Sequence, residues 1–318
     1  MKSLLINNIE WIDYFNVIIL RYILHKYFKQ CGLFNVRTDQ INSVRFSPDG
    51  TKIVLSLKDS TIQLWSTNPN ISDSREIKGH SGCVNDAQFS HDGTMIVSCS
   101  KDKTIRLWDV SSCNEIKRFE DYSRNSIRSV QFSSDKKIIV ASSIITARIW
   151  DIQSEKLIKV LRDGDCILDA RILPNNHKIF VATAYFRTIT FDMISNKATG
   201  ITWKNFFAQT AQFSPDGLSI ISCLENNTIA LWDVMSGAKV KQWERYFRPI
   251  KEKYFPSGQM ILICCEDNTM RLWDIEFGVE IQKLEGHSEE IKVFDISPDE
   301  NTIVSLSNDD TIRLWKVV

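Results

Sequence analysis

An aromatic residue returns every 41 to 43 residues along this chain, each time at the end of a short run of β-type residues. The seven runs are TIQLW, TIRLW, ARIW, TITF, TIALW, TMRLW and TIRLW. Their last residues are Trp65, Trp108, Trp150, Phe191, Trp232, Trp273 and Trp315. Self-similarity at a fixed period of this size is the signature of a repeat architecture. The chain is therefore predicted to consist of seven copies of one structural unit.

A second motif runs in step with the first and marks a polar turn in each unit. Its copies are FSPDG from Phe46, FSHDG from Phe89, FSSDK from Phe132, ILPNN from Ile172, FSPDG from Phe213, FPSG from Phe255 and ISPDE from Ile296. Proline, aspartate and glycine favour such turns. The runs between the turns are rich in Val, Ile, Thr and aromatic residues, which favour strands. Each unit is predicted to contain four short strands.

Four strands in about forty residues make one twisted antiparallel sheet, and such a sheet cannot cover both of its own faces. Seven sheets packed around an axis bury one another's faces and leave only short edges. We therefore predict an all-β fold, a seven-bladed β-propeller of four-stranded antiparallel blades, over residues 30–318. A short N-terminal helix is predicted as an extension over residues 1–29.

The repeats resemble the WD-repeat family. The second unit shows the pattern most fully, with Gly79-His80, then a strand entering FSHDG, then SCSKDKTIRLWD ending at Asp109. The resemblance covers about residues 30–318 and implies an architecture similar to that of the G-protein β subunit, in which a helix precedes seven blades. It also implies closure by overlap. The last unit stops at Val318 without a fourth strand, and residues near 31–36 are expected to supply it.

The resemblance further implies a hydrogen-bonded set of four side chains that pins a loop between blades. Two units carry it in full, as His80, Ser100, Asp102 and Trp108, and as His287, Ser307, Asp309 and Trp315. Ser98 is the alternative source of the hydroxyl in the first set. Serine, histidine and aspartate also form hydrolytic triads. A structural role is expected here, because both imidazole nitrogens would have partners inside the set.

The other five units depart from this pattern. Their residues at the histidine position are Arg37, Ser123, Asp163, Lys204 and Tyr246. Their residues at the turn-aspartate position are Asp59, Ile144, Tyr185, Asn226 and Asp267. The fourth unit also replaces tryptophan with Phe191. Blades three and four are expected to be the least rigid, or to be pinned by other contacts.

Two groups of residues are candidates for binding a partner. The first precedes the turn-aspartate position and forms a rim of Lys58, Lys101, Ser143, Ala184, Glu225, Glu266 and Asn308. Its lysines and glutamates lie in different blades. Such a charge distribution would steer a charged partner toward the rim, or it reflects the ordinary charges of solvent-exposed turns. The second group is Tyr185, Phe186, Tyr246, Phe247 and Arg248, with Trp243 nearby. Such residue types are enriched in interface hot spots, although local packing explains them equally well.

The N-terminal segment carries apolar residues on one face of the predicted helix, at Leu5, Ile9, Ile12, Ile19 and Ile23. This helix is expected to dock on the propeller, to pair with a partner helix or to lie on a membrane surface. Charges interrupt residues 4–28, and the longest aliphatic run, residues 17–20, is far too short to span a membrane. Without signal-peptide features, a cytoplasmic protein is expected, with the nucleus as the other compartment.

Composition argues against several classes of function. Lys and Arg total 39, as do Asp and Glu, so the net charge of zero disfavours a dedicated nucleic-acid binder. The eight cysteines show neither CxxC nor zinc-finger spacing. Phosphate-loop, dinucleotide-binding, HExxH and EF-hand motifs are absent from the sequence. No catalytic residue, cofactor or metal is predicted, and the expected partners are proteins or peptides.

The leading prediction is a non-catalytic scaffold or adaptor that presents a propeller surface to protein or peptide partners. Two alternatives stay open. One is a ubiquitin-ligase substrate receptor or peptide reader, although the tetrapeptides WDVS, WDIQ, WDVM and WDIE lack the WDxR pattern of cullin-type receptors. The other is a G-protein-β-like signalling subunit. That role would need a coiled-coil partner for the N-terminal helix, whose apolar seam is interrupted by Asn16.

Overall fold

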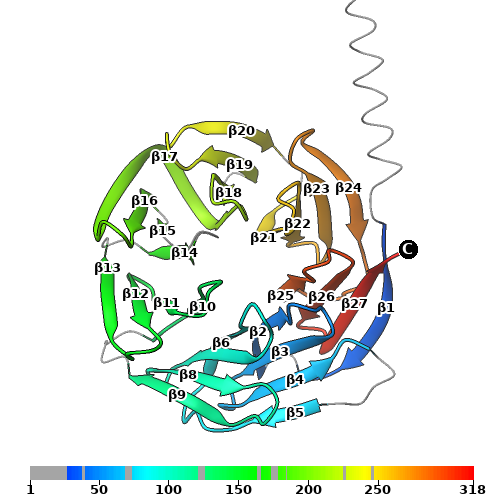
Figure 1. Cartoon of the computed structure of the whole chain (residues 1–318). Helices are drawn as coiled ribbons and strands as arrows, with labels where there is room; N and C mark the ends of the chain where they lie inside the picture. Colours follow the sequence, from blue (N-terminus) through cyan, green and yellow to red (C-terminus); the bar gives the residue numbers. More distant parts are fainter. Residues whose placement is uncertain are drawn as a thin grey trace, which may run out of the picture.

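A computed structural model shows a ring of sheets arranged radially around a central axis (Figure 1). The structure describes residues 27–37, 40–68, 74–120, 126–162, 166–172, 178–183, 185–224, 227–244 and 247–318, without the side chains of residues 185–188 and 199–209. These ranges contain 27 strands and no α-helix, which confirms the all-β prediction. The predicted N-terminal helix lies almost entirely outside the described residues.

Each blade is an antiparallel sheet whose successive strands run from the axis outward (Figure 1). Blade 1 comprises β2 (Ile41–Phe46), β3 (Lys52–Leu57), β4 (Ile62–Ser66) and β5 (Ser74–Ile77). Blade 2 comprises β6 (Val84–Phe89), β7 (Met95–Ser100), β8 (Thr104–Asp109) and β9 (Glu115–Glu120). Blade 3 comprises β10 (Ser129–Phe132), β11 (Ile138–Ser142), β12 (Thr146–Asp151) and β13 (Leu157–Arg162).

Blades 4 and 5 share one long strand, β17 (Lys197–Phe213). Blade 4 comprises β14 (Ile167–Ile172), β15 (Lys178–Thr183), β16 (Tyr185–Asp192) and the first part of β17. Blade 5 comprises the last part of β17, β18 (Ser219–Leu224), β19 (Thr228–Asp233) and β20 (Lys239–Glu244). The seven predicted blades are therefore present, but β17 joins two of them into one seven-stranded sheet.

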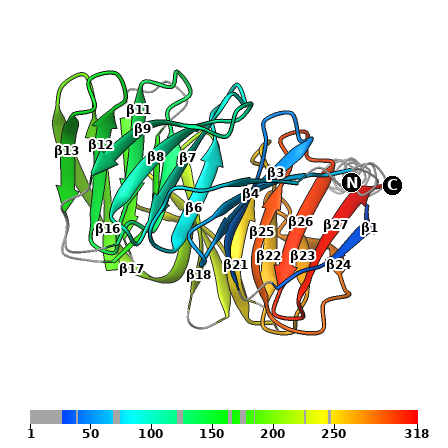
Figure 2. The same cartoon turned by 90° about the horizontal axis from the view of Figure 1, so that it is seen from below.

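The last two blades bring the chain back to its beginning. Blade 6 comprises β21 (Pro249–Tyr254), β22 (Met260–Cys265), β23 (Met270–Asp274) and β24 (Val279–Leu284). Blade 7 comprises β25 (Ile291–Ile296), β26 (Thr302–Ser307), β27 (Thr311–Val317) and β1 (Phe28–Asn35). Strand β1 pairs antiparallel with β27 and forms the outer edge of blade 7 (Figure 2). The predicted closure is thus confirmed, with a strand that begins a few residues earlier than expected.

The start of β1 is fixed at the boundary between blades 6 and 7. The backbone N–H of Phe28 donates to Gln282 Oε1 at 2.8 Å, and Gln282 Nε2 donates to the Phe28 carbonyl at 2.8 Å. The Phe28 ring packs against Phe255, with ring centroids 6.2 Å apart. Closure therefore ties the chain's early residues to two blades at once.

The register of blade 6 corrects one detail of the repeat motif. Tyr254 ends β21 and pairs with Ile261 as Phe89 pairs with Ile96, so Tyr254 and not Phe255 matches the first residue of the turn motif. Phe255 stands where blade 2 has Ser90. The apolar side chain of Phe255 enters the core beside Phe28, whereas the Ser90 hydroxyl forms hydrogen bonds within its turn.

The hydrophobic core lies between blades, as the repeat argument requires. One cluster joins Val54 and Leu64 of blade 1 to Val84 and Ile96 of blade 2. Another joins Leu314 and its neighbours in blade 7 to blade 1. Each blade therefore depends on its neighbours to remove its apolar faces from water.

Acidic side chains of the inner strands link successive blades near the axis. Asp295 Oδ2 of blade 7 accepts the backbone N–H of Phe46 in blade 1 at 2.7 Å. Asp86 of blade 2 accepts the backbone N–H of Val130 in blade 3 at 3.3 Å. Asp169 Oδ2 of blade 4 likewise accepts the backbone N–H of Phe213 in blade 5 at 3.2 Å. These bonds add polar links to the apolar contacts between neighbours.

Among the described residues, no helix is long and apolar enough to cross a membrane.

Candidate functional site

In blade 2 the loop before β6 is pinned by a chain of hydrogen bonds. His80 Nδ1 lies 2.8 Å from Asp102 Oδ2, and His80 Nε2 lies 2.8 Å from Ser98 Oγ. Trp108 Nε1 donates to the same Ser98 oxygen at 2.8 Å. Because an ionised carboxylate only accepts, Nδ1 must donate to Asp102, and the Ser98 hydroxyl can then donate to Nε2. The arrangement is satisfied with a neutral imidazole.

The hydroxyl in this set comes from Ser98, which corrects the prediction of Ser100. Ser100 lies two residues closer to the turn, where its hydroxyl donates to the Gly82 carbonyl at 2.8 Å and accepts the Asp102 backbone N–H. Its hydroxyl therefore stabilises the turn itself and does not reach between the imidazole and the indole.

Blade 7 repeats this geometry and requires the same correction. His287 Nδ1 lies 2.8 Å from Asp309 Oδ2, and Trp315 Nε1 donates to Ser305 Oγ at 2.9 Å. Ser305 Oγ also lies 2.8 Å from His287 Nε2. Ser307, the predicted member, donates instead to the Glu289 carbonyl at 2.7 Å.

The electrostatics of these sets favour a structural role over catalysis. Burial lowers the pKa of His80 despite the opposing effect of Asp102. Burial would raise the pKa of Asp102, but hydrogen bonds from Thr104 and His80 outweigh it and lower that pKa to about 2. Asp102, His80 and Ser98 follow the order of a hydrolytic triad. The Ser98 side chain is fully buried under the Trp108 indole, so a substrate carbonyl cannot reach its oxygen.

The predicted binding residues are spread around the ring. Four of them occupy the same position of the repeat in four different blades, namely Lys58, Lys101, Glu266 and Asn308. In each case the backbone N–H donates to a carbonyl of the loop that enters the same blade. Tyr185 belongs to β16, but its side chain, the Phe186 side chain, Ala184, Glu225 and Tyr246 lie outside the described structure. Among the candidates whose side chains the structure describes, several come together at blade 6 alone.

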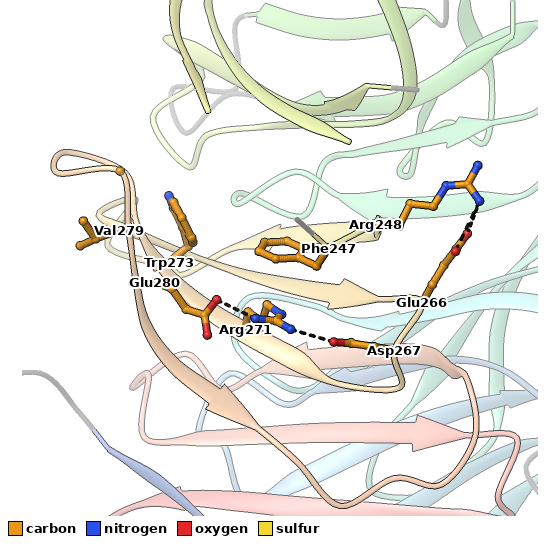
Figure 3. A pocket seen from close by; sticks show the side chains of 9 residues that line it. Phe247, Arg248, Glu266, Asp267, Arg271, Trp273, Val279 and Glu280 are labelled. Atoms are coloured by element: carbon orange, nitrogen blue, oxygen red, sulfur yellow. Dashed lines mark hydrogen bonds and ion pairs between the residues drawn. The ribbon is translucent and has the colours of Figure 1, made fainter. Parts of the chain in front are cut away.

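A pocket of about 610 Å³ lies at blade 6 and includes three predicted residues (Figure 3). Its lining residues are Phe247, Arg248, Glu266, Asp267, Arg271, Trp273, Gly278, Val279 and Glu280. Phe247 and Arg248 come from the loop before β21, Glu266 and Asp267 from the turn after β22, and the others from β23, β24 and their turn. The sequence analysis therefore named Phe247, Arg248 and Glu266 as candidates but not Arg271 and Glu280 of the same pocket.

Arg271 organises the pocket. Its guanidinium donates to Glu280 Oε2 at 2.8 Å and to Asp267 Oδ2 at 2.7 Å, and its central carbon lies 4.4 Å from the centroid of the Phe247 ring (Figure 3). These two hydrogen-bonded carboxylates raise the pKa of Arg271 against the lowering effect of burial. At the rim, Arg248 Nη1 lies 3.1 Å from Glu266 Oε1.

The pocket opens because the preceding loop is shorter than its counterpart in blade 2. Ile77 and Trp243 hold the same place in their outer strands, and Val84 and Pro249 hold the same place in their inner strands. Six residues separate Ile77 from Val84, whereas five separate Trp243 from Pro249. The shorter loop has no glycine–histidine pair.

In blade 2, Gly79 closes the space that is equivalent to the blade 6 pocket. A Cβ at Gly79 would lie 2.7 Å from Trp108 Cη2 and 2.9 Å from Arg106 Nη1, so the backbone there rests directly on both side chains. Asp102 is 5% exposed beneath that loop, whereas Asp267 in blade 6 is 41% exposed. Blade 6 thus retains the arginine, aspartate and tryptophan of the repeat while leaving its aspartate accessible.

The repeats, the closed ring and the pinned loops define the family of this chain, and comparison with known proteins agrees. The sequence profile described as "IFT122 first beta-propeller" matches residues 40–316. The chain belongs to this family of WD-repeat propellers. The family assignment covers nearly the whole described ring, from β2 to β27.

Two curated proteins show weaker similarity. The mouse protein "Cilia- and flagella-associated protein 52" is 22% identical over 199 residues, which cover 61% of this chain and 32% of that protein. The Dictyostelium discoideum "Serine-threonine kinase receptor-associated protein" is 28% identical over 117 residues, which cover 36% of this chain and 39% of that protein. The aligned parts thus span well under half of either relative.

Proposed function

We propose that this propeller is a non-catalytic protein-interaction platform and that the blade 6 pocket is its main binding surface. The observation that supports the proposal is the gathering of Phe247, Arg248 and Glu266 around one opening. Aromatic and arginine side chains beside a concave surface are typical of interface hot spots. WD-repeat propellers typically serve as scaffolds, and the geometry of the pinned loops provides a rigid frame for such a surface.

The cellular setting belongs to the same proposal. We place the chain in the cytoplasm, in a larger protein assembly, and the name of the mouse relative points to cilia and flagella as the first compartment to test. A ubiquitin-ligase receptor or a G-protein-β-like subunit would also bind through the propeller. Neither alternative has an observation in the described structure that favours it.

The test compares the partners captured by three forms of the tagged chain, the wild type and two double variants. The double variant Phe247→Ala/Arg248→Ala removes two pocket residues, and Leu218→Ala/Arg118→Ala is the matched control, since it removes one exposed apolar and one exposed basic side chain outside the pocket. Affinity purification with quantitative mass spectrometry should show partners that the pocket variant loses and the control keeps. Equal recovery by both variants would show that the pocket is not the binding surface.

A folding control keeps this test decisive. Phe247 packs against Trp273, so its loss costs some stability, and thermal melting of each variant must show a folded domain at the assay temperature. Val279→Lys serves as a second pocket variant, because Val279 is an exposed residue of the pocket wall and its replacement leaves the Phe247 contact in place. Loss of the same partners in this variant is expected.

A further inference from the structure

The blade 6 pocket presents carboxylates to solvent and keeps its central guanidinium withdrawn. Glu266 is 52% exposed and Asp267 41%, whereas Arg271 is only 14% exposed. The lining holds three carboxylates, those of Glu266, Asp267 and Glu280, against two guanidinium groups. One negative charge is therefore in excess, and Arg248, which is 59% exposed, pairs with Glu266 at the rim.

Asp267 carries that charge at neutral pH. Its partial burial would raise its pKa, but hydrogen bonds from Thr269 and Arg271 outweigh burial and lower the pKa below its usual value. Thr269 Oγ1 donates to Oδ1 at 2.5 Å, and Arg271 donates to Oδ2. A carboxylate oxygen accepts more than one hydrogen bond, so Asp267 can receive a further donor from the solvent side.

Blades 2 and 7 show which chemistry this aspartate receives elsewhere in the same ring. There the preceding loop places a ring nitrogen on it, with His80 Nδ1 and His287 Nδ1 each 2.8 Å from the carboxylate. In blade 6, the described residues that bond Asp267 are Thr269 and Arg271. Arg271 Nη2 already supplies a nitrogen donor to the equivalent oxygen, and the 41% exposure of Asp267 leaves its carboxylate accessible to a further donor from another molecule.

The apolar part of the pocket suits the stem of a long side chain. Val279 is 46% exposed on the wall, and the Phe247 ring lies between it and the rim pair of Arg248 and Glu266 (Figure 3). Arginine and lysine combine a hydrocarbon stem with a charged end, and they commonly bury the stem while the charge reaches a polar region.

We infer that the blade 6 pocket binds a basic side chain, arginine above all, that a partner polypeptide inserts toward Asp267 and Glu266. The stem lies along Val279 and Phe247, and the guanidinium donates to the two exposed carboxylates. A planar guanidinium matches a carboxylate with two parallel hydrogen bonds, which a lysine ammonium does not. This inference rests on the proposed function, since it names the chemistry that the partner brings to the same pocket.

The test uses three small probes that differ in charge and shape. N-acetyl-arginine methylamide, the corresponding lysine amide and the neutral citrulline amide are titrated at millimolar concentration, with saturation-transfer NMR on the full chain. Arginine should bind at least about tenfold more tightly than citrulline, and its affinity should fall as salt is raised because the contacts are solvent-exposed. No saturation of arginine, or equal binding of arginine and citrulline, would overturn the inference.

Variants assign the binding to this pocket. Glu266→Gln/Asp267→Asn removes both exposed charges, whereas Glu285→Gln/Glu76→Gln removes two exposed carboxylates elsewhere. Arginine binding should weaken about tenfold or more in the first variant and stay unchanged in the second. Unchanged binding in the first variant would also overturn the inference.

The two proposals can fail separately. If the arginine probe fails while Phe247→Ala/Arg248→Ala still loses partners, the pocket is a binding surface for a different chemistry. If the probe binds but the partners do not depend on the pocket, the proposed function fails while the site for a basic side chain stands.

Discussion

Phe247 meets Trp273 edge to face, with ring centroids 6.4 Å apart and an interplanar angle of 63°. His80 meets Trp108 in blade 2 in nearly the same way, at 5.8 Å and 65°. In blade 6 the Phe247 ring therefore makes the aromatic contact that the His80 imidazole makes in blade 2, but it cannot form the hydrogen bonds of an imidazole. Asp267 bonds Arg271 in consequence, and the pocket differs in chemistry from the pinned loops of blades 2 and 7.

The pinned loops predict the effect of removing one hydroxyl. Ser98→Ala leaves the Trp108 N–H and the His80 Nε2 without their shared partner, which is expected to cost about 2 kcal/mol of unfolding free energy. Ser112→Ala, in an exposed turn, should cost less than about 0.5 kcal/mol. Urea denaturation of both variants checks the difference. A larger loss from Ser100→Ala than from Ser98→Ala would contradict the assignment of the hydroxyl.

Blades 3 and 5 offer a reciprocal experiment on the same position. Trp232 Nε1 donates to Ser222 Oγ at 2.9 Å, whereas blade 3 has Ala141 at that position. The buried Trp150 Nε1 has no hydrogen-bond partner among the described residues. Ala141→Ser is expected to stabilise the domain by about 1 kcal/mol, and Ser222→Ala to destabilise it by about 1–2 kcal/mol. Shifts of the same sign in both variants would refute this reasoning.

A buried acid predicts how stability depends on pH. Glu252 lies between blades 5 and 6, where its carboxyl receives hydrogen bonds from Thr210 and Cys223. Burial nevertheless raises its pKa from 4.5 to about 7. Below pH 4.5 the group is protonated in both the folded and unfolded states. Its contribution to stability is then lost progressively as pH rises to 7, by about 3 kcal/mol in total.

Glu252→Gln tests that sign directly. The amide keeps an acceptor for Thr210 but cannot ionise, so the variant should be more stable than the wild type at pH 8 and show no gain at pH 4. Denaturant unfolding from pH 4 to 8 measures both slopes. Glu285→Gln, which changes an exposed side chain, should follow the wild-type curve. Identical pH slopes for wild type and Glu252→Gln would rule out the buried acid as the cause.

Ring closure predicts a contrast between two residues of one strand. Phe28 is 2% exposed and packs on Phe255, whereas Leu33 in the same strand is 50% exposed. Phe28→Ala is expected to cost about 3 kcal/mol, because it leaves a cavity between blades 6 and 7. Leu33→Ala should cost less than about 1 kcal/mol. Comparable melting temperatures for the two variants would show that closure does not depend on this anchor.

The seven blades and their closure were predictable because the same strand and turn motifs recur seven times at nearly constant spacing. One defective copy, such as the blade with Phe191, does not hide a period that six others carry. The continuous strand β17 was not predictable. It pairs with β16 of blade 4 and with β18 of blade 5, and the repeat motifs do not specify whether the backbone between two blades continues as one strand. The N-terminal helix stays a prediction.

The candidate site was predictable only in part. Phe247, Arg248 and Glu266 stood out by residue type or turn position, but Arg271 and Glu280 did not, because both match ordinary positions of the repeat, those of Arg106 and Glu115 in blade 2. What distinguishes blade 6 is a missing glycine and a loop one residue shorter. Aligning the repeats by their inner and outer strands separately would have revealed this difference. Ser98 was only the alternative to Ser100 in the sequence analysis, because two serines of one strand fit the same motif.

The pairing of β1 with β27 also decides when the ring can form during synthesis. On a ribosome, Phe28–Asn35 emerges ahead of almost the whole propeller, and its partner Thr311–Val317 emerges after it. Until then the early strand has an unpaired edge that is open to wrong neighbours. That edge therefore stays unpaired, or is covered by a chaperone, while the strands between β1 and β27 are synthesised.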